Sequence, residues 1–197
     1  MPDGQMTRER ILDEALRLFA RDGYEAVSVS AIAGALGITK GALYRHYPGK
    51  RAIFDAIIER MVRLDHAAAG ECGVPQEQPG DADEASPEAL RRFTLAQYRF
   101  WTEDGFAVRV RRMLCLEQFR SREMNALYQQ YIGAGPLGYV RDLLAALNVA
   151  DAADMAALLY APMLLGYVLY DGASDKAAVT ALVDSALNRA AALIAAR

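Results

Sequence analysis

Cysteine and histidine are both scarce in this chain of 197 residues, which contains two of each. Cys72 and Cys115 lie far apart and lack the spacing of metal ligands, so we expect two free thiols in a reducing compartment and neither a metal nor another cofactor. His46 and His66 are not placed with a serine or cysteine as in a nucleophilic triad, and no phosphate-binding loop occurs. These absences argue against an enzyme.

Long uncharged apolar runs are also missing, since none reaches the roughly 18 residues that a membrane span requires. The N-terminal stretch MPDGQMTRER lacks the apolar core of a signal peptide. With 53% hydrophobic and 24% charged residues, the composition is that of an ordinary soluble globular protein. The sequence therefore predicts a cytoplasmic protein with no membrane partner.

Positive charge is in slight deficit, because the net charge is −3 at neutral pH. The charges are segregated, however. Residues 26–54 contain no Asp or Glu, yet they include Lys40, Arg45, Lys50 and Arg51. Residues 65–90 contain seven acids and no Lys or Arg, and their middle part, about 68–86, is predicted to be a polar, acidic loop. A local basic patch is what phosphate contact needs, so the acidic average does not exclude DNA binding.

Strand-like alternation is confined to residues 27–30, whereas helical periodicity runs through almost the whole chain. We therefore predict an all-α fold of about nine helices, with an N-terminal three-helix domain that contains a helix-turn-helix and a C-terminal helical bundle. The breaker pair Pro48-Gly49 places the boundary between domains 1–49 and 50–197. Five C-terminal helices are expected, at 87–103, 106–118, 121–147, 151–171 and 175–196. Glycines and a proline at 133–136 should kink or split the third of them.

Residues 28–47 have the spacing of a helix-turn-helix. Ala33 is small enough for a close crossing of two helices, and Gly37 can adopt the backbone of the tight turn between them. Apolar Ile38 and Leu43 would wedge the helices together. The second helix would then present its outer face to the major groove of DNA.

The stretch SVSAIAGALGITKGALYRHYPGKRAIFDAI, which spans residues 28–57, closely resembles the DNA-binding signature of the TetR/AcrR family of bacterial repressors. Together with the upstream helix, the resemblance covers about the first 60 residues; beyond them it extends only to helix number, helix length and total size. It implies a DNA-binding transcriptional regulator, a repressor that binds a palindromic operator as a dimer and is released by a small-molecule ligand.

The resemblance also implies roles for individual residues. Serine hydroxyls at a helix start and polar residues of the recognition helix would contact phosphates, while Lys40, Gly41 and Ala42 would supply what base readout there is. The predicted DNA-contact residues are Ser28, Ser30, Thr39, Lys40, Gly41, Ala42, Tyr44, Arg45, His46 and Lys50. Three of them have a plainer alternative: Tyr44 could be a core residue, His46 a helix cap, and Lys50 a solvated lysine. Tyr47, next to the turn, is expected to be core.

The resemblance to the TetR/AcrR family implies that residues 50–197 form the ligand-binding and dimerisation domain. Aromatic and polar side chains at helical spacing suit an apolar cavity, although the same spacing is typical of an ordinary core. The candidate ligand-binding residues are Phe93, Gln97, Trp101, Met113, Glu117, Tyr128 and Tyr131. The last two helices would form the homodimer interface, for which the candidates are Ala156, Tyr160, Met163, Tyr167, Tyr170, Leu182, Ala186 and Arg189.

One alternative function stays open at this level. The protein could be a DNA-binding regulator with no small-molecule inducer, controlled by its abundance or by a protein partner. A packed core without a cavity would favour that alternative, whereas an enclosed cavity with convergent polar groups would favour a ligand sensor.

Overall fold

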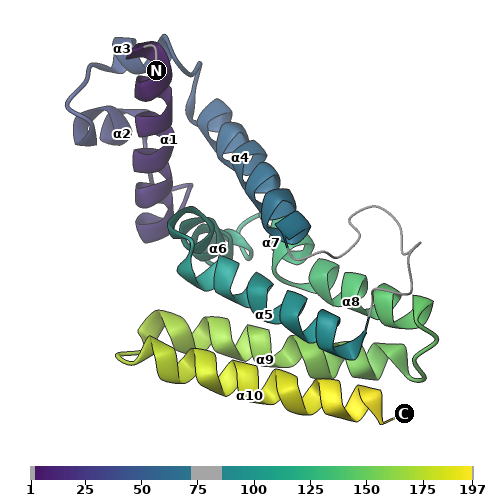
Figure 1. The fold of residues 1–197 in the computed structure, drawn as a ribbon. Coiled ribbons are helices and arrows are strands. Elements are labelled where there is room, and N and C mark those ends of the chain that lie inside the picture. Colours follow the sequence, from purple (N-terminus) through teal and green to yellow (C-terminus); the bar gives the residue numbers. More distant parts are fainter. Residues whose placement is uncertain (1–2, 72–85, 197) are drawn as a thin grey trace. The chain divides into compact units, whose positions relative to one another are not determined.

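The computed structural model describes residues 3–71 and 86–196, and these residues form ten α-helices without any strand (Figure 1). The all-α prediction is therefore confirmed. The described residues contain ten helices and the sequence predicted about nine, because the segment predicted as one helix at 121–147 is split into two. Most of the predicted acidic loop lies outside the described residues, although the preceding helix continues to Glu71 rather than ending near residue 68.

The helices group into two compact units that do not follow the chain order. One consists of Met1–Leu64 with Gly105–Tyr128, and the other of Asp65–Asp104 with Gln129–Arg197. The predicted boundary at 49/50 coincides with the beginning of a helix at Lys50. The first compact unit nevertheless continues beyond that point, so an independent functional domain of residues 1–49 stays a prediction.

The first unit contains the helix-turn-helix. Its helices are α1 (Asp3–Asp22), α2 (Val29–Ala35), α3 (Lys40–Tyr44), the first part of α4 (Lys50–Glu71), α6 (Gly105–Glu117) and most of α7 (Arg122–Tyr131). Its N-terminal half is held by an aromatic cluster in which the Tyr24 ring lies 5.2 Å from that of Phe19 and 4.9 Å from that of Phe54. Helix α6 packs against α1, which is why residues distant in sequence join this unit.

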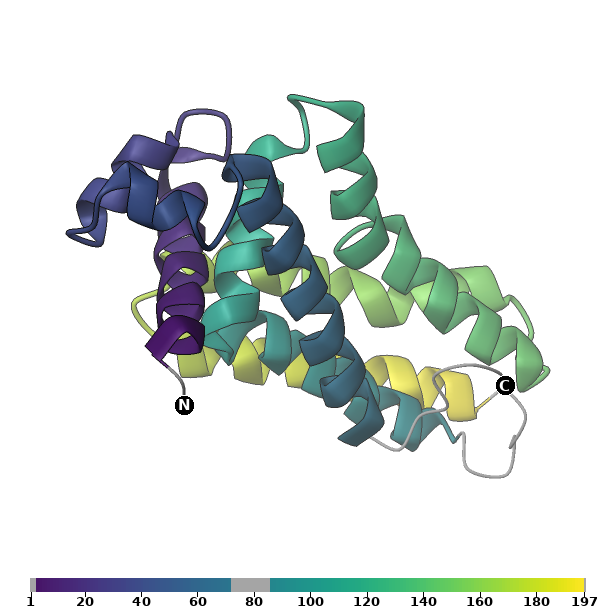
Figure 2. The same ribbon diagram turned by 90° about the horizontal axis from the view of Figure 1, so that it is seen from above.

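The second unit is a helical bundle made from α5 (Pro87–Glu103), α8 (Ala134–Ala146), α9 (Ala152–Gly172) and α10 (Lys176–Ala195). Helices α9 and α10 run side by side, and α5 packs against both (Figure 2). The break before α8 lies where glycine is needed: a Cβ at Gly135 would collide with the backbone carbonyl of Gln130. Glycine thus permits the close approach that separates α7 from α8.

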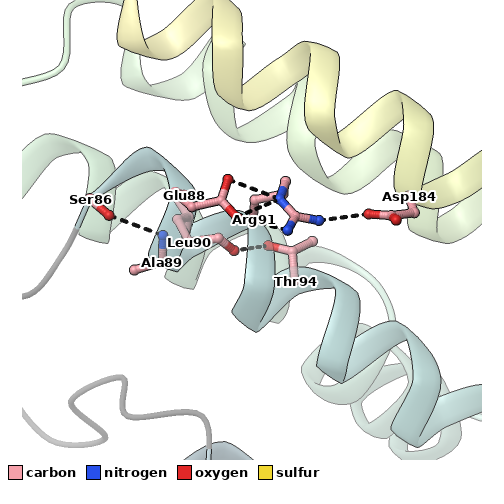
Figure 3. Close-up of polar contacts among 7 residues, drawn as sticks. All are labelled: Ser86, Glu88, Ala89, Leu90, Arg91, Thr94 and Asp184. Carbon is pink, nitrogen blue, oxygen red and sulfur yellow. Dashed lines mark hydrogen bonds and ion pairs between the residues drawn. The ribbon is translucent and has the colours of Figure 1, made fainter.

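Helix α5 is fixed at both its start and its flank (Figure 3). The Ser86 side chain accepts a hydrogen bond of 3.1 Å from the backbone N–H of Ala89, which caps the helix. The Arg91 guanidinium binds Glu88 on its own helix and Asp184 of α10, the latter at 2.6 Å. This arginine therefore ties α5 to the last helix.

Helices α9 and α10 are each long and apolar enough to cross a membrane by length and composition alone. The central helices of a water-soluble bundle meet the same criterion, and these two pack against each other and against α5. The observation is weak evidence for a membrane span.

Candidate nucleic-acid interface and ligand cavity

The turn between α2 and α3 has the geometry that a helix-turn-helix requires. Gly37 adopts a left-handed backbone with φ +67°, which a residue without a Cβ tolerates at little cost. The backbone N–H of Ile38 then bonds the carbonyl of Ala33 at 3.0 Å and closes the turn. The buried side chains of Ile32, Ala33 and Leu43 join the two helices.

Both helices begin at a hydroxyl residue. The Ser28 Oγ accepts from the backbone N–H of Ala31, and the Thr39 Oγ1 accepts from that of Ala42, each at 3.1 Å. Each hydroxyl keeps its own proton for donation to an oxygen of a bound molecule. The two residues thus stabilise the local helices while still offering a donor to a phosphate.

Most of the predicted DNA-contact residues lie at the surface. The exposed ones are Ser28, Ser30, Thr39, Lys40, Gly41, Tyr44 and Arg45, while Ala42 and His46 are half-buried. The Tyr44 side chain is 45% exposed, so it is not a core tyrosine, and the Lys40 ammonium lies 5.8 Å from the centre of its ring. Tyr47 is buried, as predicted. The structure brings a tyrosine hydroxyl, a lysine and an arginine to one short helix and its end.

Lys50 differs from the other predicted contacts because its ammonium is bound within the protein. It donates to the backbone carbonyls of Tyr24 and Glu25, at 2.9 and 3.2 Å, and lies 4.3 Å from the centre of the Tyr24 ring. The lysine therefore fastens the start of α4 to the loop after α1. The plainer alternative of a solvated lysine is wrong, and a phosphate contact by Lys50 stays a prediction.

A cavity of about 300 Å³ lies inside the second unit. Its lining comes from the end of α4, from α5, from the segment around the α7–α8 break and from α9. Six of the fifteen lining residues are aromatic: Phe93, Trp101, Tyr131, Tyr139, Tyr160 and Tyr167. They are arranged partly in pairs, with ring centres 5.8 Å apart for Phe93 and Tyr139 and 6.4 Å apart for Trp101 and Tyr131.

Polar groups of the cavity differ in whether they are already engaged. The Thr94 hydroxyl donates to the backbone carbonyl of Leu90 at 2.8 Å, and the Tyr160 hydroxyl donates to that of Ile132. Asp65 is half-buried, and this burial raises the pKa of its carboxyl above the ordinary value. Burial and the negative charge of Asp65 together raise the pKa of Tyr131. The negative charge of Asp65 therefore influences the ionisation of the Tyr131 hydroxyl in the same cavity.

Four of the seven predicted ligand-binding residues line this cavity: Phe93, Gln97, Trp101 and Tyr131. The other three, Met113, Glu117 and Tyr128, belong to the first unit and do not line it. Met113 and Glu117 are fully buried on α6. A Cβ on Gly23 would touch the Glu117 carboxylate, so α6 directs this acid towards the end of α1. Helical spacing alone did not reveal that α6 packs with the N-terminal helices.

The predicted dimer residues fall into two groups. Ala156, Tyr160, Met163, Tyr167 and Tyr170 are buried within the second unit, for example through the stacking of Tyr98 on Tyr167 at 5.7 Å between ring centres. They are not available to a partner chain, and the assignment is corrected here. Leu182, Ala186 and Arg189 instead line an apolar groove between α9 and α10.

The exposed face of α9 is the one opposite to that predicted. Leu158 is 43% exposed, Leu165 55% and Leu169 40%, and all three line the same groove as Leu182. Because α9 is apolar on all sides, its sequence does not distinguish the face towards the bundle from the face towards the outside.

Comparison with known proteins bears on the first unit most directly. A profile described as bacterial regulatory proteins of the tetR family matches residues 11–57, which span α1 to the first turns of α4. The N-terminal residues 11–57 therefore resemble the DNA-binding region of the TetR family. This family consists of transcriptional regulators and not of enzymes, as the sequence predicted.

Two curated relatives share the N-terminal region. The chain is 46% identical over 57 residues to the HTH-type transcriptional regulator AcrR of Shigella flexneri, a match that covers 29% of this chain and 26% of that protein. It is 31% identical over 102 residues to the HTH-type transcriptional repressor DrrR1 of Streptomyces coeruleorubidus, covering 50% and 34%. The chain thus matches about a third or less of the length of these relatives.

A solved structure extends the likeness of fold to nearly the whole chain. A transcriptional regulator from Saccharomonospora viridis, crystallised in complex with choline, superposes with a TM-score of 0.66 at 21% identity and covers 94% of this chain and 95% of that one. At this identity the likeness shows a shared fold alone.

Several cavity residues were missed or misassigned at the level of sequence. By sequence, Asp65 belongs to the acidic stretch that follows it, and Tyr139 carries no distinguishing signal. Tyr160 and Tyr167, which the sequence predicts as dimer contacts, line the cavity instead. A usable signal was the isolation of Asp65, since no Lys or Arg stands at the i+3 or i+4 position where a solvated helix acid commonly finds one.

Proposed function

We propose that the protein is a transcriptional repressor that binds a palindromic operator as a homodimer and is released from it by a small molecule. The observation that carries this proposal is the exposed face of α2 and α3, where Ser28, Thr39, Lys40, Tyr44 and Arg45 lie together in a stretch without any acid. Such a surface suits contact with phosphates and with the major groove.

The roles of the individual contacts follow from their chemistry. Tyr44 and the two capping hydroxyls would donate hydrogen bonds to phosphates, and Arg45 would add a charge-assisted contact. Gly41 and Ala42 have almost no side chain, so the helix can approach the base edges closely, and Lys40 could donate to a guanine. Few residues would contact the edges of the bases, whereas many would contact the phosphates and position the protein on the DNA.

Dimerisation would give the operator its symmetry. The apolar groove between α9 and α10, with Leu158, Leu165 and Leu182 exposed, supports pairing of two copies through these helices. Two recognition helices on a twofold axis meet successive major grooves when they are about 34 Å apart. A ligand that favours a dimer with different spacing must weaken DNA binding, by linkage.

The cavity in the second unit supports a sensor over a regulator without an inducer. Its lining combines apolar side chains with the polar side chains of Asp65 and Gln97. The similarly folded regulator from Saccharomonospora viridis holds choline, which is in keeping with a small molecule in a protein of this architecture. As a DNA-binding protein, this one would act in the cytoplasm.

Gel-shift titration on the DNA that flanks its own gene tests the DNA-binding part. Tyr44→Ala and Arg45→Ala should each weaken binding to every sequence, and Arg45→Ala should reduce the slope of log affinity against log salt by about one. Arg99→Ala is the matched control, because this exposed arginine of α5 lies outside the helix-turn-helix. Unchanged affinity in both variants, or an equal loss in the control, would refute the assigned surface.

A further inference from the structure

Aromatic rings are the most frequent kind of side chain in the lining of the cavity in the second unit. Phe93 and Tyr139 form one aromatic pair, and Trp101 and Tyr131 form another. The faces of aromatic rings carry partial negative charge and attract a cation placed within about 6 Å of the ring centre. A box of such faces is the arrangement that proteins use for alkylated ammonium groups.

One carboxylate adds formal negative charge to this box. Asp65 lines the cavity from the end of α4, and the lining residues that the structure describes include no Lys or Arg to neutralise it. The neighbouring His66 lowers the pKa of Asp65, but burial raises it by more. His66 is exposed, so water screens its charge. The described lining residues therefore include no buried cationic partner for the half-buried carboxylate of Asp65.

Some of the hydrogen-bond donors that line the same cavity are already used within the protein. The donor protons of Thr94 and Tyr160 are used by backbone carbonyls of Leu90 and Ile132. Other neutral polar groups also belong to lining residues: the side-chain amides of Gln97 and Gln130, the hydroxyls of Tyr131, Tyr139 and Tyr167, and the indole N–H of Trp101. Such groups can orient a ligand, whereas a positive charge would in addition interact with Asp65 and the rings together.

We propose that this cavity binds an organic cation, namely an ammonium group that carries alkyl or aryl substituents, with the charge between Asp65 and the aromatic pairs. The inference rests on the proposed response to a small molecule and specifies the chemistry of that site. The substituents contact the apolar wall, and the charged nitrogen compensates the carboxylate. An anionic ligand such as a fatty carboxylate is disfavoured, because it would place two negative charges in one desolvated space.

Trp101 provides a direct readout of occupancy. It is the one tryptophan of the chain, and it lines the cavity. Titration of the full-length protein is followed by Trp101 fluorescence and by calorimetry with four probes: benzyltrimethylammonium, choline, the neutral analogue of choline in which a quaternary carbon replaces the nitrogen, and phenylbutyrate. We expect at least one cation to bind, and choline to bind at least about tenfold more tightly than its neutral analogue.

Two variants localise the effect of charge. Asp65→Asn keeps the size of the side chain and should lower the affinity for the cations by about tenfold, with a smaller change for the neutral analogue. Asp142→Asn is the control, because this carboxylate of α8 is 66% exposed, pairs with Arg141 and does not line the cavity. It should bind all four probes as the unaltered protein does.

The possible outcomes separate this inference from the proposed function. If the neutral analogue or phenylbutyrate changes Trp101 fluorescence and the cations do not, the cavity is a ligand site of another class and the inference is overturned while the ligand response stands. Equal affinity of Asp65→Asn for the cations overturns it as well. If none of the probes binds, the inference is overturned. Gel shifts with the same preparation test the DNA-binding function independently of that result.

Discussion

At the scale of the residue, Gly23 holds the most constrained backbone position of the first unit. Its φ is +88°, and a Cβ there would touch the carboxylate of Glu117, which is fully buried and forms an ion pair of 3.3 Å with Arg120. The acid has little room to move. Any side chain at Gly23 therefore meets both backbone strain and a steric conflict with α6.

Three glycine variants separate these contributions. Gly34→Ala should be neutral or stabilising, because Gly34 is helical and nothing lies within 4 Å of the added Cβ. Gly37→Ala should cost about 1 kcal/mol from left-handed strain alone. Gly23→Ala should cost about 2–3 kcal/mol from strain plus the contact with Glu117. Urea unfolding measures the order; equal losses at Gly23 and Gly37 would contradict the role of Glu117.

Asp65 makes stability depend on pH in a defined direction. Because burial raises the pKa of its carboxyl in the folded state, the unfolded state loses this proton first, and the carboxyl destabilises the fold increasingly as pH rises from the ordinary value of about 3.9 through the raised pKa. Asp65→Asn should therefore raise the melting temperature at pH 7, and the gain should shrink towards pH 4. A gain that is constant with pH would show that the charge of Asp65 is not responsible.

At the scale of the element, one half-buried arginine contributes to the contact between α5 and α10. The Arg91 side chain is only 15% exposed, and its partner Asp184 is 38% exposed. A partly buried ion pair is screened less than a surface pair, and removing one partner leaves the other desolvated. When Asp184 is removed, Arg91 still forms an ion pair with Glu88, which limits the loss of free energy of unfolding.

Asp184→Ala should consequently lower the free energy of unfolding by about 1 kcal/mol. Asp142→Ala is the comparison, since Arg141 and Asp142 form a pair that is 53% and 66% exposed, and its loss should stay within about 0.5 kcal/mol. Chemical denaturation of both variants at low salt gives the difference. If the two losses were the same, Arg91 would not fasten α5 to α10.

At the scale of the whole molecule, the groove between α9 and α10 bears on how two copies assemble. Leu165→Asp places a charge in the middle of this groove and should convert a dimer into a monomer, as measured by sedimentation equilibrium. Phe119→Asp is the control: Phe119 is 87% exposed in the first unit and does not line the groove. A dimer that survives Leu165→Asp would refute pairing through these helices.

Removal of residues 1–49 is a poor test of the same interface. Helix α6 packs against α1 within the first unit, so the deletion would uncover an apolar face of α6 and create a new site for association. Point substitutions in the groove avoid this complication because they leave the first unit intact.

The sequence by itself determined the helical elements and the position of the helix-turn-helix. Helix caps at Ser28, Thr39 and Ser86 and the breakers after each helix are local, and the helix-turn-helix is encoded within residues 28–47 by spacing alone. Such features require no distant contact, so they can be read from neighbouring residues. The exposure of Tyr44 and the burial of Tyr47 followed from the same local geometry.

Only the tertiary structure decided which apolar residues face one another. Helix α9 is apolar around its whole circumference, so its sequence could not distinguish Tyr160 and Tyr167, which line the cavity, from Leu158 and Leu165, which line the outer groove. The packing of α6 on α1 removed Met113 and Glu117 from the candidate ligand residues. These assignments depend on contacts between residues far apart in the chain, and helical periodicity carries no information about which partner covers each face.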